Sequence, residues 1–279
     1  MKKLFFVGLS IFVVFGLLGT FLWFSVNKQY EKQETYKKVF KNNETNQIII
    51  NAQNTDVDVK KGRYLEINYD GKHKVNANIE NNLLHFSEQD KKLTFNANFI
   101  PFRKVNNHLT ITLPEKNYNA FNITTNTGNI NIENVKSKNS NIITGTGNIT
   151  FDQVDFKHVK AMADVGSIGI KNSKLYEFNG ELDTGNITVD NSVLKNNEMI
   201  TSIGNIKIID LKNECDIKAS TEDGNILIDY KHKPQDTLLQ LHADSGSTKI
   251  ENSAFHGEKV GNGKNVIESY TDNGDIKIK

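Results

Sequence analysis

The stretch Leu182–Asn191, LDTGNITVDN, decides the fold, because variants of it recur from Phe121 to the last residue of the sequence. Each copy carries one glycine at the same place, and the first five of these glycines are 19 residues apart. The glycines that mark the copies are Gly128, Gly147, Gly166, Gly185, Gly204, Gly224, Gly246 and Gly274. Self-similarity at so short a period is typical of a protein built from stacked rungs.

The apolar residues of each copy predict two short strands. β-Branched residues such as Ile187 and Val189 stand two and four positions after the glycine, which is the pattern of a strand with one buried face. A second alternating run precedes the glycine, as in Ile217, Ala219 and Thr221. Such a unit cannot bury its apolar edge alone, so we expect like strands to stack about 4.8 Å apart around a shared core.

The bends between these strands have a chemistry of their own. Asn186 follows Gly185, and Asn191 stands six residues after it, as similar residues do in most copies. Glycine and asparagine tolerate the positive φ that a sharp corner requires, and stacked amides can hydrogen-bond along the axis. The sequence therefore predicts an all-β fold, a right-handed parallel β-helix with rungs of about 19 residues. A propeller or sandwich fits less well, because one period is too short for a four-stranded blade.

An uncharged run of 23 residues, Leu4 to Val26, lies near the start of the sequence. Because about 20 apolar residues cross a bilayer as a helix, it predicts an N-terminal transmembrane anchor over residues 1–27. No cleavage site of the Ala-x-Ala kind follows, which disfavours a signal peptide. We expect a juxtamembrane linker at 28–46, a single-pass location in the cell membrane, and the following domain outside the cytoplasm. Charge alone does not decide this orientation, since lysines flank the run on both sides.

Residues 47–118 alternate without a strict repeat. We expect them to form irregular first rungs or a β cap, and the regular repeats to occupy 119–279, because a stack of rungs needs atypical units that cover its ends. The final Ile276-Lys277-Ile278-Lys279 predicts an open edge guarded by lysines. The alternating groups are Ile48/Ile50, Val57/Val59, Leu65/Ile67/Tyr69, Val75/Ala77/Ile79, Leu83/His85, Leu93/Phe95/Ala97 and Leu109/Ile111/Leu113.

Composition argues against several classes of function. The chain has 279 residues and a net charge of +1, so no bulk charge indicates a nucleic-acid partner. Cys215 is the single cysteine, which rules out an intrachain disulfide and a cysteine metal site. The seven histidines are scattered without metal-ligand spacing. We therefore expect no catalytic, cofactor-binding or metal-binding residues, no cofactor, and no enzymatic activity.

Two acidic loops were the strongest signals for chemistry. Asp183-Thr184-Gly185 and Asp244-Ser245-Gly246 resemble aspartic-protease loops, in which two carboxylates share a proton. As copies of one corner they are expected three rungs apart, about 14 Å, which is too far. The same corner predicts an acidic column that is either a weak divalent-cation edge or a solvated turn. The column consists of Asp164, Asp183, Glu222, Asp244 and Asp272, interrupted by Ser202.

The apolar run, the Leu113-Pro114 pair and the repeated Thr-x-x-Gly-Asn-Ile-x-Ile units together resemble a known family. It is the adhesin-like domain of unknown function in LiaG-like envelope proteins of low-GC Gram-positive bacteria. The resemblance covers the chain from about residue 46 onward, together with the apolar run. It implies a β-solenoid outside the cytoplasmic membrane, with ties to envelope stress systems and without established catalytic residues.

We therefore expect a non-catalytic, membrane-tethered scaffold or adhesin-like interaction module at the bacterial cell envelope. Its expected partners are a cell-wall polymer or an envelope-stress membrane protein, and not nucleic acid. One alternative is a carbohydrate-active enzyme on a β-helix, which would need acidic and basic residues clustered on one face. The other is a self-assembling filament protein built by stacking open ends.

Overall fold

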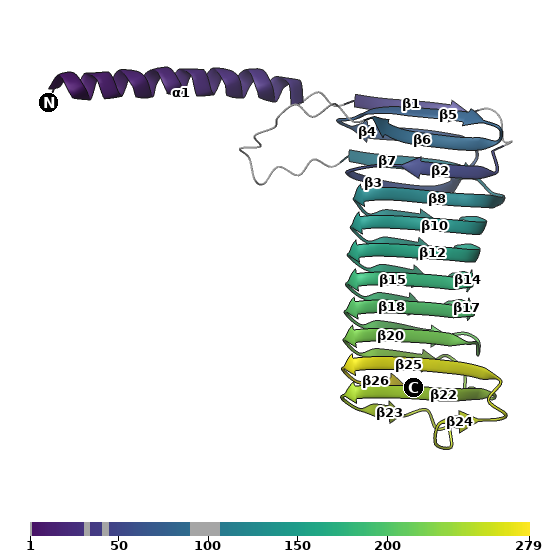
Figure 1. The fold of residues 1–279 in the computed structure, drawn as a ribbon. Coiled ribbons are helices and arrows are strands. Elements are labelled where there is room, and N and C mark those ends of the chain that lie inside the picture. Colours follow the sequence, from purple (N-terminus) through teal and green to yellow (C-terminus); the bar gives the residue numbers. More distant parts are fainter. Residues whose placement is uncertain (1, 31–33, 41–44, 90–106) are drawn as a thin grey trace.

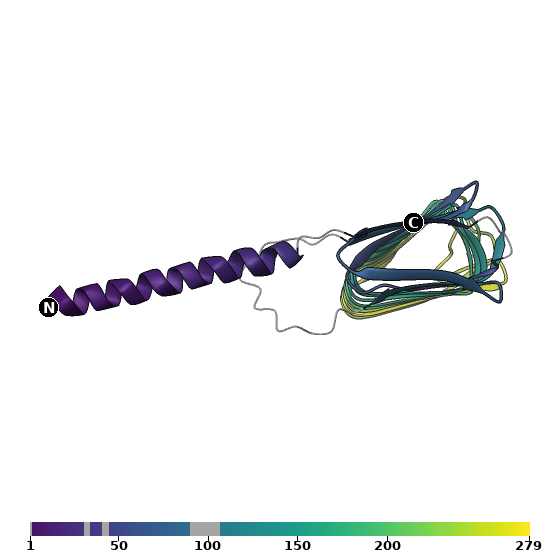
Figure 2. The ribbon, with the colours of Figure 1, turned by 90° about the horizontal axis from the view of Figure 1, so that it is seen from above.

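A computed structural model of the protein describes residues 2–30, 34–40, 45–89 and 107–279, and in helix α1 (Lys2–Tyr30) it describes the side chains of residues 6–21. Beyond α1 the described chain is built of strands in two large sheets. Figure 1 shows the strands stacked one above another, and Figure 2, viewed along the stack, shows them superposed around a common interior. The repeats therefore do form rungs.

Each rung contributes strands to both sheets. The 12-stranded first sheet has the spatial order β1 (Glu34–Phe40), β4 (Leu65–Gly71), β7 (Asn107–Pro114), β3 (Thr55–Gly62), β9 (Ile130–Glu133), β11 (Ile149–Asp152), β13 (Ile168–Lys171), β16 (Ile187–Asp190), β19 (Ile206–Leu211), β21 (Ile226–Tyr230), β26 (Ile276–Ile278), β23 (Thr248–Ile250). The main path of the 14-stranded second sheet is β24 (Lys259–Val260), β22 (Thr237–Ser245), β25 (Asn265–Asn273), β20 (Ile217–Asp223), β18 (Asn197–Ile203), β15 (Phe178–Thr184), β12 (Asp155–Val165), β10 (Lys136–Thr146), β8 (Asn117–Thr127), β2 (Gln47–Asn51), β6 (Leu83–Gln89), β5 (Lys74–Glu80). Off this path lie β14 (Lys174–Tyr176) and β17 (Val193–Lys195).

The prediction of a closed, right-handed parallel β-helix is wrong, because both sheets are mixed. Strand β4 pairs antiparallel with β1 and β7, β5 with β6, and β22 with β24. The cause is local: Asn81 and Asn82, with φ of 50° and 62°, join β5 to β6, and a two-residue turn can only return the chain antiparallel. Between these end regions the strands stack in parallel, giving a β-solenoid-like middle with mixed ends.

The irregular segment also contains the strands that its alternation predicts. Strands β2 to β7 cover the predicted groups at Ile48/Ile50, Val57/Val59, Leu65/Ile67/Tyr69, Val75/Ala77/Ile79, Leu83/His85 and Leu109/Ile111/Leu113. The group Leu93/Phe95/Ala97 lies outside the described residues. Within the expected linker, Glu34–Phe40 forms β1 and pairs with β4.

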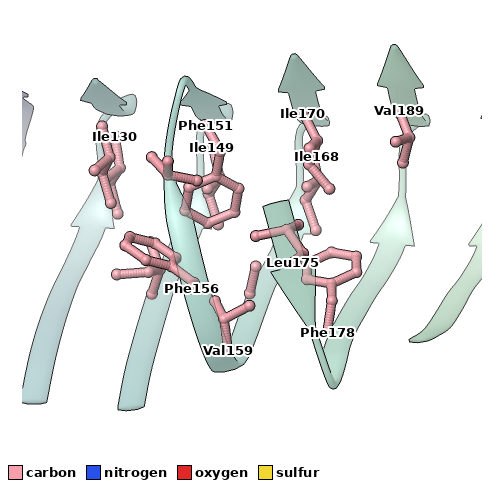
Figure 3. Close-up of a cluster of buried hydrophobic side chains, with 14 of the residues drawn as sticks. Ile130, Ile149, Phe151, Phe156, Val159, Ile168, Ile170, Leu175, Phe178 and Val189 are labelled. Carbon is pink, nitrogen blue, oxygen red and sulfur yellow. The ribbon is translucent and has the colours of Figure 1, made fainter. Parts of the chain in front are cut away.

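The stacked isoleucine core is confirmed. Ile187 lies between Ile168 and Ile206 in the first sheet, and all three side chains are fully buried. Figure 3 shows side chains of the first sheet facing those of the second across the interior. Phe151 of β11 and Phe156 of β12 form one such pair, with ring centroids 5.7 Å apart. Burying one such side chain is worth about 2 kcal/mol, so the interior supplies most of the cohesion between rungs.

The corner chemistry is also as expected. Seven of the eight marker glycines have φ between 142° and 156°, and a Cβ on Gly185 would lie 1.5 Å from the carbonyl oxygen of Gly166 one rung away. The next residue forms the amide ladder: the backbone and side-chain nitrogens of Asn205 donate to Asn186 Oδ1 at 2.8 and 3.1 Å. The second corner has positive φ at Asn134, Gln153, Asn172, Asn191 and Asp210.

The order of the rungs departs from the order of the sequence at both ends. Strands β25 and β26 lie between β20–β21 and β22–β23, although they follow both in the chain (Figure 1). At the other end, β2 and β3 lie between β6–β7 and β8–β9, although they precede both. We call these two units the exchanged rungs. The predicted open edge at Ile276–Lys279 is therefore wrong, since β26 is paired on both sides.

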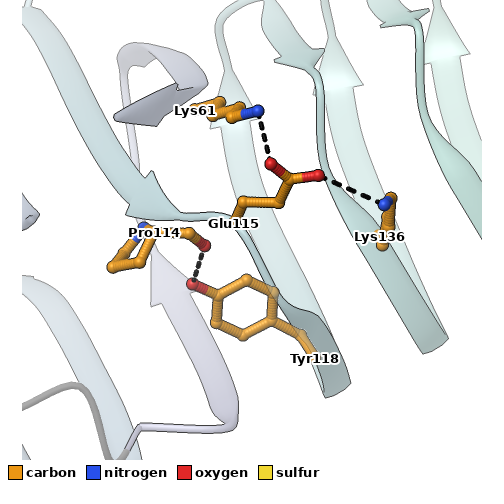
Figure 4. Close-up of polar contacts among 5 residues, drawn as sticks. All are labelled: Lys61, Pro114, Glu115, Tyr118 and Lys136. Atoms are coloured by element: carbon orange, nitrogen blue, oxygen red, sulfur yellow. Dashed lines mark hydrogen bonds and ion pairs between the residues drawn. The ribbon is translucent and has the colours of Figure 1, made fainter. Parts of the chain in front are cut away.

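An ion-pair bridge crosses the exchanged rung at the first end, as Figure 4 shows. Glu115 follows β7 and accepts hydrogen bonds from Lys61 of β3 at 2.5 Å and from Lys136 of β10 at 3.2 Å. These two contacts lower the pKa of the Glu115 carboxyl. Beside it, the Tyr118 hydroxyl donates to the carbonyl of Pro114 at 3.0 Å. The bridge therefore ties the irregular segment to the regular repeats.

A pH-dependent contact holds the edge strand β23 at the second end. Glu251 contacts Lys249 at 2.7 Å and Lys277 of β26 at 3.0 Å, and their hydrogen bonds lower its pKa to about 2 from 4.5. A depressed carboxyl pKa stabilises the fold above the unfolded value, and this contribution is lost as the pH falls toward 2. We expect Glu251→Gln to lower the melting temperature at pH 7 but not at pH 2, in thermal unfolding followed by circular dichroism. An equal difference at both pH values would contradict this role.

The predicted transmembrane anchor over residues 1–27 and the predicted cell-membrane location are wrong. Among the described residues, no helix combines the length and the apolar character that crossing a membrane requires.

Candidate functional site: a groove across four strands

A hollow on the described surface lies at the start of strands β15, β18, β20 and β25 in the second sheet. Its cavity volume is about 570 Å³, within the usual range of ligand sites. We call this hollow the groove. It is lined by Glu177, Phe178, Asn179, Asn196, Asn197, Glu198, Asp216, Ile217, Lys218, Lys264, Val266 and Glu268.

The groove arises because the chain bends where neighbouring rungs run straight. Strand β12 continues without a break over this part of its rung, but Glu177 and Asn196 adopt φ of 53° and 55°. These left-handed residues separate β14 from β15 and β17 from β18. In the following rung, residues 213–216 form no strand at all. The outward surface is therefore hollowed over three successive rungs and bordered by the start of β25.

Polar side chains form a row across the four strands of the groove. Asn179 pairs in register with Glu198, Glu198 with Lys218, and Lys218 with Glu268, so one outward side chain from each rung joins the row. Phe178, Asn197 and Ile217 alternate with the row and are buried. Because strands lie about 4.8 Å apart, the row spans about 14 Å along the stack. A linear ligand along the axis would meet one such side chain on every rung.

The row is held by charge pairing. Lys218 Nζ lies 3.0 Å from Glu198 Oε1, and the hydrogen bond to Glu198, followed by the charges of Glu198 and Glu268, raises the pKa of Lys218. At one end of the groove, His158 Nδ1 lies 2.6 Å from Glu177 Oε2. Asp216 accepts a hydrogen bond from the backbone of Val266 at 2.8 Å. The carboxylates of Glu177, Glu198 and Asp216 thus have partners without being buried.

Two amide groups of the groove carry unused hydrogen-bonding capacity. Asn197 is only 4% exposed; its Oδ1 accepts from the backbone of Phe178 at 3.1 Å, but its Nδ2 has no partner among the described residues. Asn179 Oδ1 is likewise buried without a described partner. Buried polar atoms are normally paired. Both atoms are enclosed by protein, and Asn197 lies on the inward face of β18 beside the buried Ile217, so neither is presented to a ligand in the groove.

The acidic column follows the exchanged order of the rungs. Asp183 and Asp244 lie four strands apart instead of the expected three, about 19 Å, because β25 intervenes. Asp244 contacts His242 Nε2 at 2.6 Å and accepts from the Tyr270 hydroxyl at 3.0 Å. Hydrogen bonds to Asp272 and then Asp244 raise the pKa of Tyr270. The column lies near the ends of its strands, with Asp164, Asp183, Glu222 and Asp244 exposed and Asp272 partly buried. Whether it binds cations stays a prediction.

No metal site or activated thiol accompanies the groove. Within the part of the chain that the structure describes, no three histidine, cysteine or acidic side chains gather closely enough to hold a metal ion. Cys215 is buried, and this burial, followed by the charge of Asp216, raises the pKa of its thiol to about 12. It therefore stays a protonated thiol at neutral pH and is a poor nucleophile.

The sequence contained a signal for the groove that the repeat analysis missed. The signal lies in the half of each period that is far from the marker glycine. There, the segment Leu175-Tyr-Glu-Phe178 recurs 19 residues later as Leu194-Lys-Asn-Asn197. In the second copy, asparagine replaces the phenylalanine at a core position. A polar residue at a core position, beside a residue that tolerates positive φ, indicates that the strand is irregular at this point.

The comparisons with known proteins agree with the fold. A family model described as Toastrack DUF4097 matches residues 45–279. The chain belongs to the Toastrack DUF4097 family. Among proteins of curated function, none matches this Toastrack chain. The family model does not separate LiaG-like proteins from other members, so the resemblance to LiaG-like proteins stays a prediction.

Solved structures from three bacteria match this chain. A candidate lipid-binding protein from Parabacteroides distasonis covers 89% of this chain and 98% of its own, with 18% identity and a TM-score of 0.53, which shows a shared fold alone. A candidate cell adhesion protein from Clostridium sporogenes covers 89% and 99%, with 15% identity and a TM-score of 0.34. A candidate adhesin from Bacteroides fragilis covers 89% and 98%, with 12% identity and a TM-score of 0.40. The Toastrack region, residues 45–279, is thus a β-solenoid-like domain.

Proposed function

We propose that this Toastrack chain is a non-catalytic interaction module and that the groove binds a cell-wall polymer. The observation that supports the proposal is the row Asn179, Glu198, Lys218 and Glu268, which presents polar groups on four successive rungs of a hollowed surface. Sugar hydroxyls donate and accept hydrogen bonds, as do amide, carboxylate and ammonium groups together. An open groove along the stack accommodates a chain that continues beyond both of its ends.

The non-catalytic part of the proposal draws on the chemistry of the groove. Its carboxylates are exposed; Lys218 contacts Glu198, and Asp216 accepts from the backbone of Val266. A carboxyl that acts as a general acid at neutral pH usually lies in an apolar pocket, whereas Glu177, Asp216 and Glu268 are exposed. A carbohydrate-active enzyme is the alternative, and chain shortening of a bound polymer would favour it. A tie to envelope stress, through a membrane protein partner, is a further prediction from the resemblance alone.

Binding to purified cell-wall glycan strands tests the proposal with a matched pair of variants. Asn179→Ala removes the amide at one end of the row and should weaken binding about fivefold, since one hydrogen bond is worth about 1 kcal/mol. Asn141→Ala is the control, because Asn141 occupies the same outward row two rungs away and lies outside the groove. Calorimetric titration of the full chain gives both affinities. Failure of the parent chain to bind, or equal losses in both variants, would contradict a wall-polymer site at the groove.

A further inference from the structure

The outer edge of the last rung is only half covered. Strands β22 and β23 lie at the opposite end of the stack from β1 (Figure 1). Strand β24 pairs with Thr237 and Leu238, and the backbone nitrogen of Leu239 donates to the carbonyl of Glu258 at 2.7 Å. Over residues 240–250, no described strand pairs with the outer side of β22 or β23. An unpaired strand edge of this kind is a template for a further strand.

The apolar interior is also incompletely covered at this edge. Ala243 of β22 and Ile250 of β23 pack against the core but are only partly buried. Thr221 and Ile228 occupy the same register columns two strands further into the stack, and they are at most 1% exposed. The difference is the cover that one more layer of strands gives. The last rung therefore lacks one such layer on its outer side.

Both open strands present outward-facing backbone groups at these same two residues. The N–H of Leu239 faces away from β25, and the backbone groups of alternate residues in a strand point to the same side, so those of Ala243 face outward as well. In β23, the Ser247 carbonyl and the Glu251 N–H bond to β26, which leaves the backbone of Ile250 facing outward. Each strand can therefore exchange a pair of N–H···O=C bonds with an antiparallel strand centred on Ala243 or on Ile250.

The side chains around Ile250 are complementary to a second copy of themselves. Lys249 and Glu251 flank it, and both are exposed. In an antiparallel pair of two β23 strands centred on Ile250, Lys249 of each copy lies directly opposite Glu251 of the other. Opposite charges in such positions stabilise a strand pair, whereas like charges destabilise it. A pair centred one residue earlier would bring the two Lys249 side chains together, so the charges select one register.

The neighbouring strand is complementary about the same axis. His242 and Asp244 flank Ala243 and are exposed, so an antiparallel pair centred on Ala243 places His242 opposite Asp244 of the second copy. Ala243 precedes the corner Gly246-Ser247 by three residues, and Ile250 follows it by three. The two residues thus lie opposite each other across the interior, and one twofold axis through both serves both strands.

We propose that the open edge of β22 and β23 binds a second copy of this chain, strand antiparallel to strand, about a twofold axis through Ala243 and Ile250. Each sheet then continues from one copy into the other, and each end covers the partly exposed interior of its counterpart. A twofold contact uses the same surface on both copies, so it closes on a pair of chains and does not continue into a filament. This inference goes beyond the proposed function and does not depend on a ligand in the groove.

Disulfide trapping in the full chain tests the register. His242→Cys chains and Asp244→Cys chains are mixed in equal amounts and oxidised. Directly opposed residues of an antiparallel pair have Cα atoms about 4.5 to 5.5 Å apart, within the range that a disulfide bridges. In either variant alone the two cysteines are diagonal neighbours about 7 to 8 Å apart, so the mixture should give about threefold more linked dimer or better.

Thr124→Cys mixed with Asn126→Cys is the matched control. Thr124 occupies the same register column as His242, and Asn126 stands two residues further on, as the second cysteine of the test pair does. Both control residues are exposed, but their strand β8 is paired on both sides, with β2 and β10. This mixture should give no more linked dimer than the parent chain, whose Cys215 is buried.

Sedimentation of the full chain measures the pairing without a cross-link. The parent should shift from monomer to dimer as its concentration rises. Ala243→Pro should weaken the dimer about tenfold or more, because proline removes an outward N–H that the pair uses and that an edge strand does not need. Its melting temperature in dilute solution should stay near that of the parent. A parent that stays monomeric, equal disulfide yields from the mixture and the single variants, or linked species that grow beyond dimers would each overturn the twofold pair.

Discussion

Replacing Ile187 with aspartate should unfold the stacked rungs or cost at least about 4 kcal/mol of stability, because the side chain is fully buried between Ile168 and Ile206. A carboxylate there has no cationic partner within the aliphatic interior, so it would be taken up only in its neutral form. The loss should therefore be larger at pH 7 than at pH 4. Urea unfolding followed by circular dichroism measures both values.

The neighbouring residue gives a matched control for this substitution. Thr188 follows Ile187 in β16 and is partly exposed, so its side chain lies on the outward face of the same strand. Thr188→Asp adds the same charge to the same rung and should change the stability by no more than about 0.5 kcal/mol. Similar unfolding curves for Ile187→Asp and the parent would show that the isoleucine column is not the core.

Adding one methyl group at Gly185 should be nearly as damaging. A Cβ there would meet the carbonyl oxygen of Gly166 at 1.5 Å, and the φ of 142° is one that residues with side chains rarely adopt. Neighbouring rungs would have to move apart at the corner, with the loss of hydrogen bonds there. We expect Gly185→Ala to cost about 3 kcal/mol or more in chemical unfolding.

A second glycine separates the corner effect from a general effect of alanine. Gly169 lies in β13, in the next rung, and a Cβ there would meet no atom within 4 Å. Gly169→Ala should be neutral or stabilise the fold by a few tenths of a kcal/mol, since alanine has fewer unfolded conformations than glycine. Equal destabilisation by both substitutions would refute the close approach at Gly185.

The repeat predicted which residues stack, because the same side chains recur at the same distance from each glycine. The buried Ile168, Ile187 and Ile206, the corner glycines and the amide ladder all follow from that periodicity. Periodicity does not determine the spatial order of the rungs, because the equivalent strands of any two copies could pair with each other. One sign of the exchange was nonetheless present: β26 keeps the paired isoleucines, whereas β23 has Thr248 in place of the first. The poorer copy is the one at the edge.

Other features depended on interactions that a repeat does not encode. The antiparallel ends follow from short turns such as Asn81-Asn82, which a search for long periods passes over. The groove follows from single residues, Glu177 and Asn196, that bend otherwise straight strands. The apolar run before residue 27 was interpreted by its length and lack of charge, whereas no helix among the described residues meets the requirements of a membrane span.

The exchanged rungs determine how the rod can come apart. Residues 265–278 are hydrogen-bonded along both edges, to β20 and β21 on one side and to β22 and β23 on the other. Fraying from this segment would have to break two ladders at once, whereas a terminal strand at a sheet edge breaks only one. During folding, however, β22 and β23 are synthesised first and can dock prematurely in the place that β25 and β26 later occupy. In the folded protein, this arrangement therefore stabilises β25 and β26 against detachment. During folding, it leaves a position in which β22 and β23 can dock incorrectly.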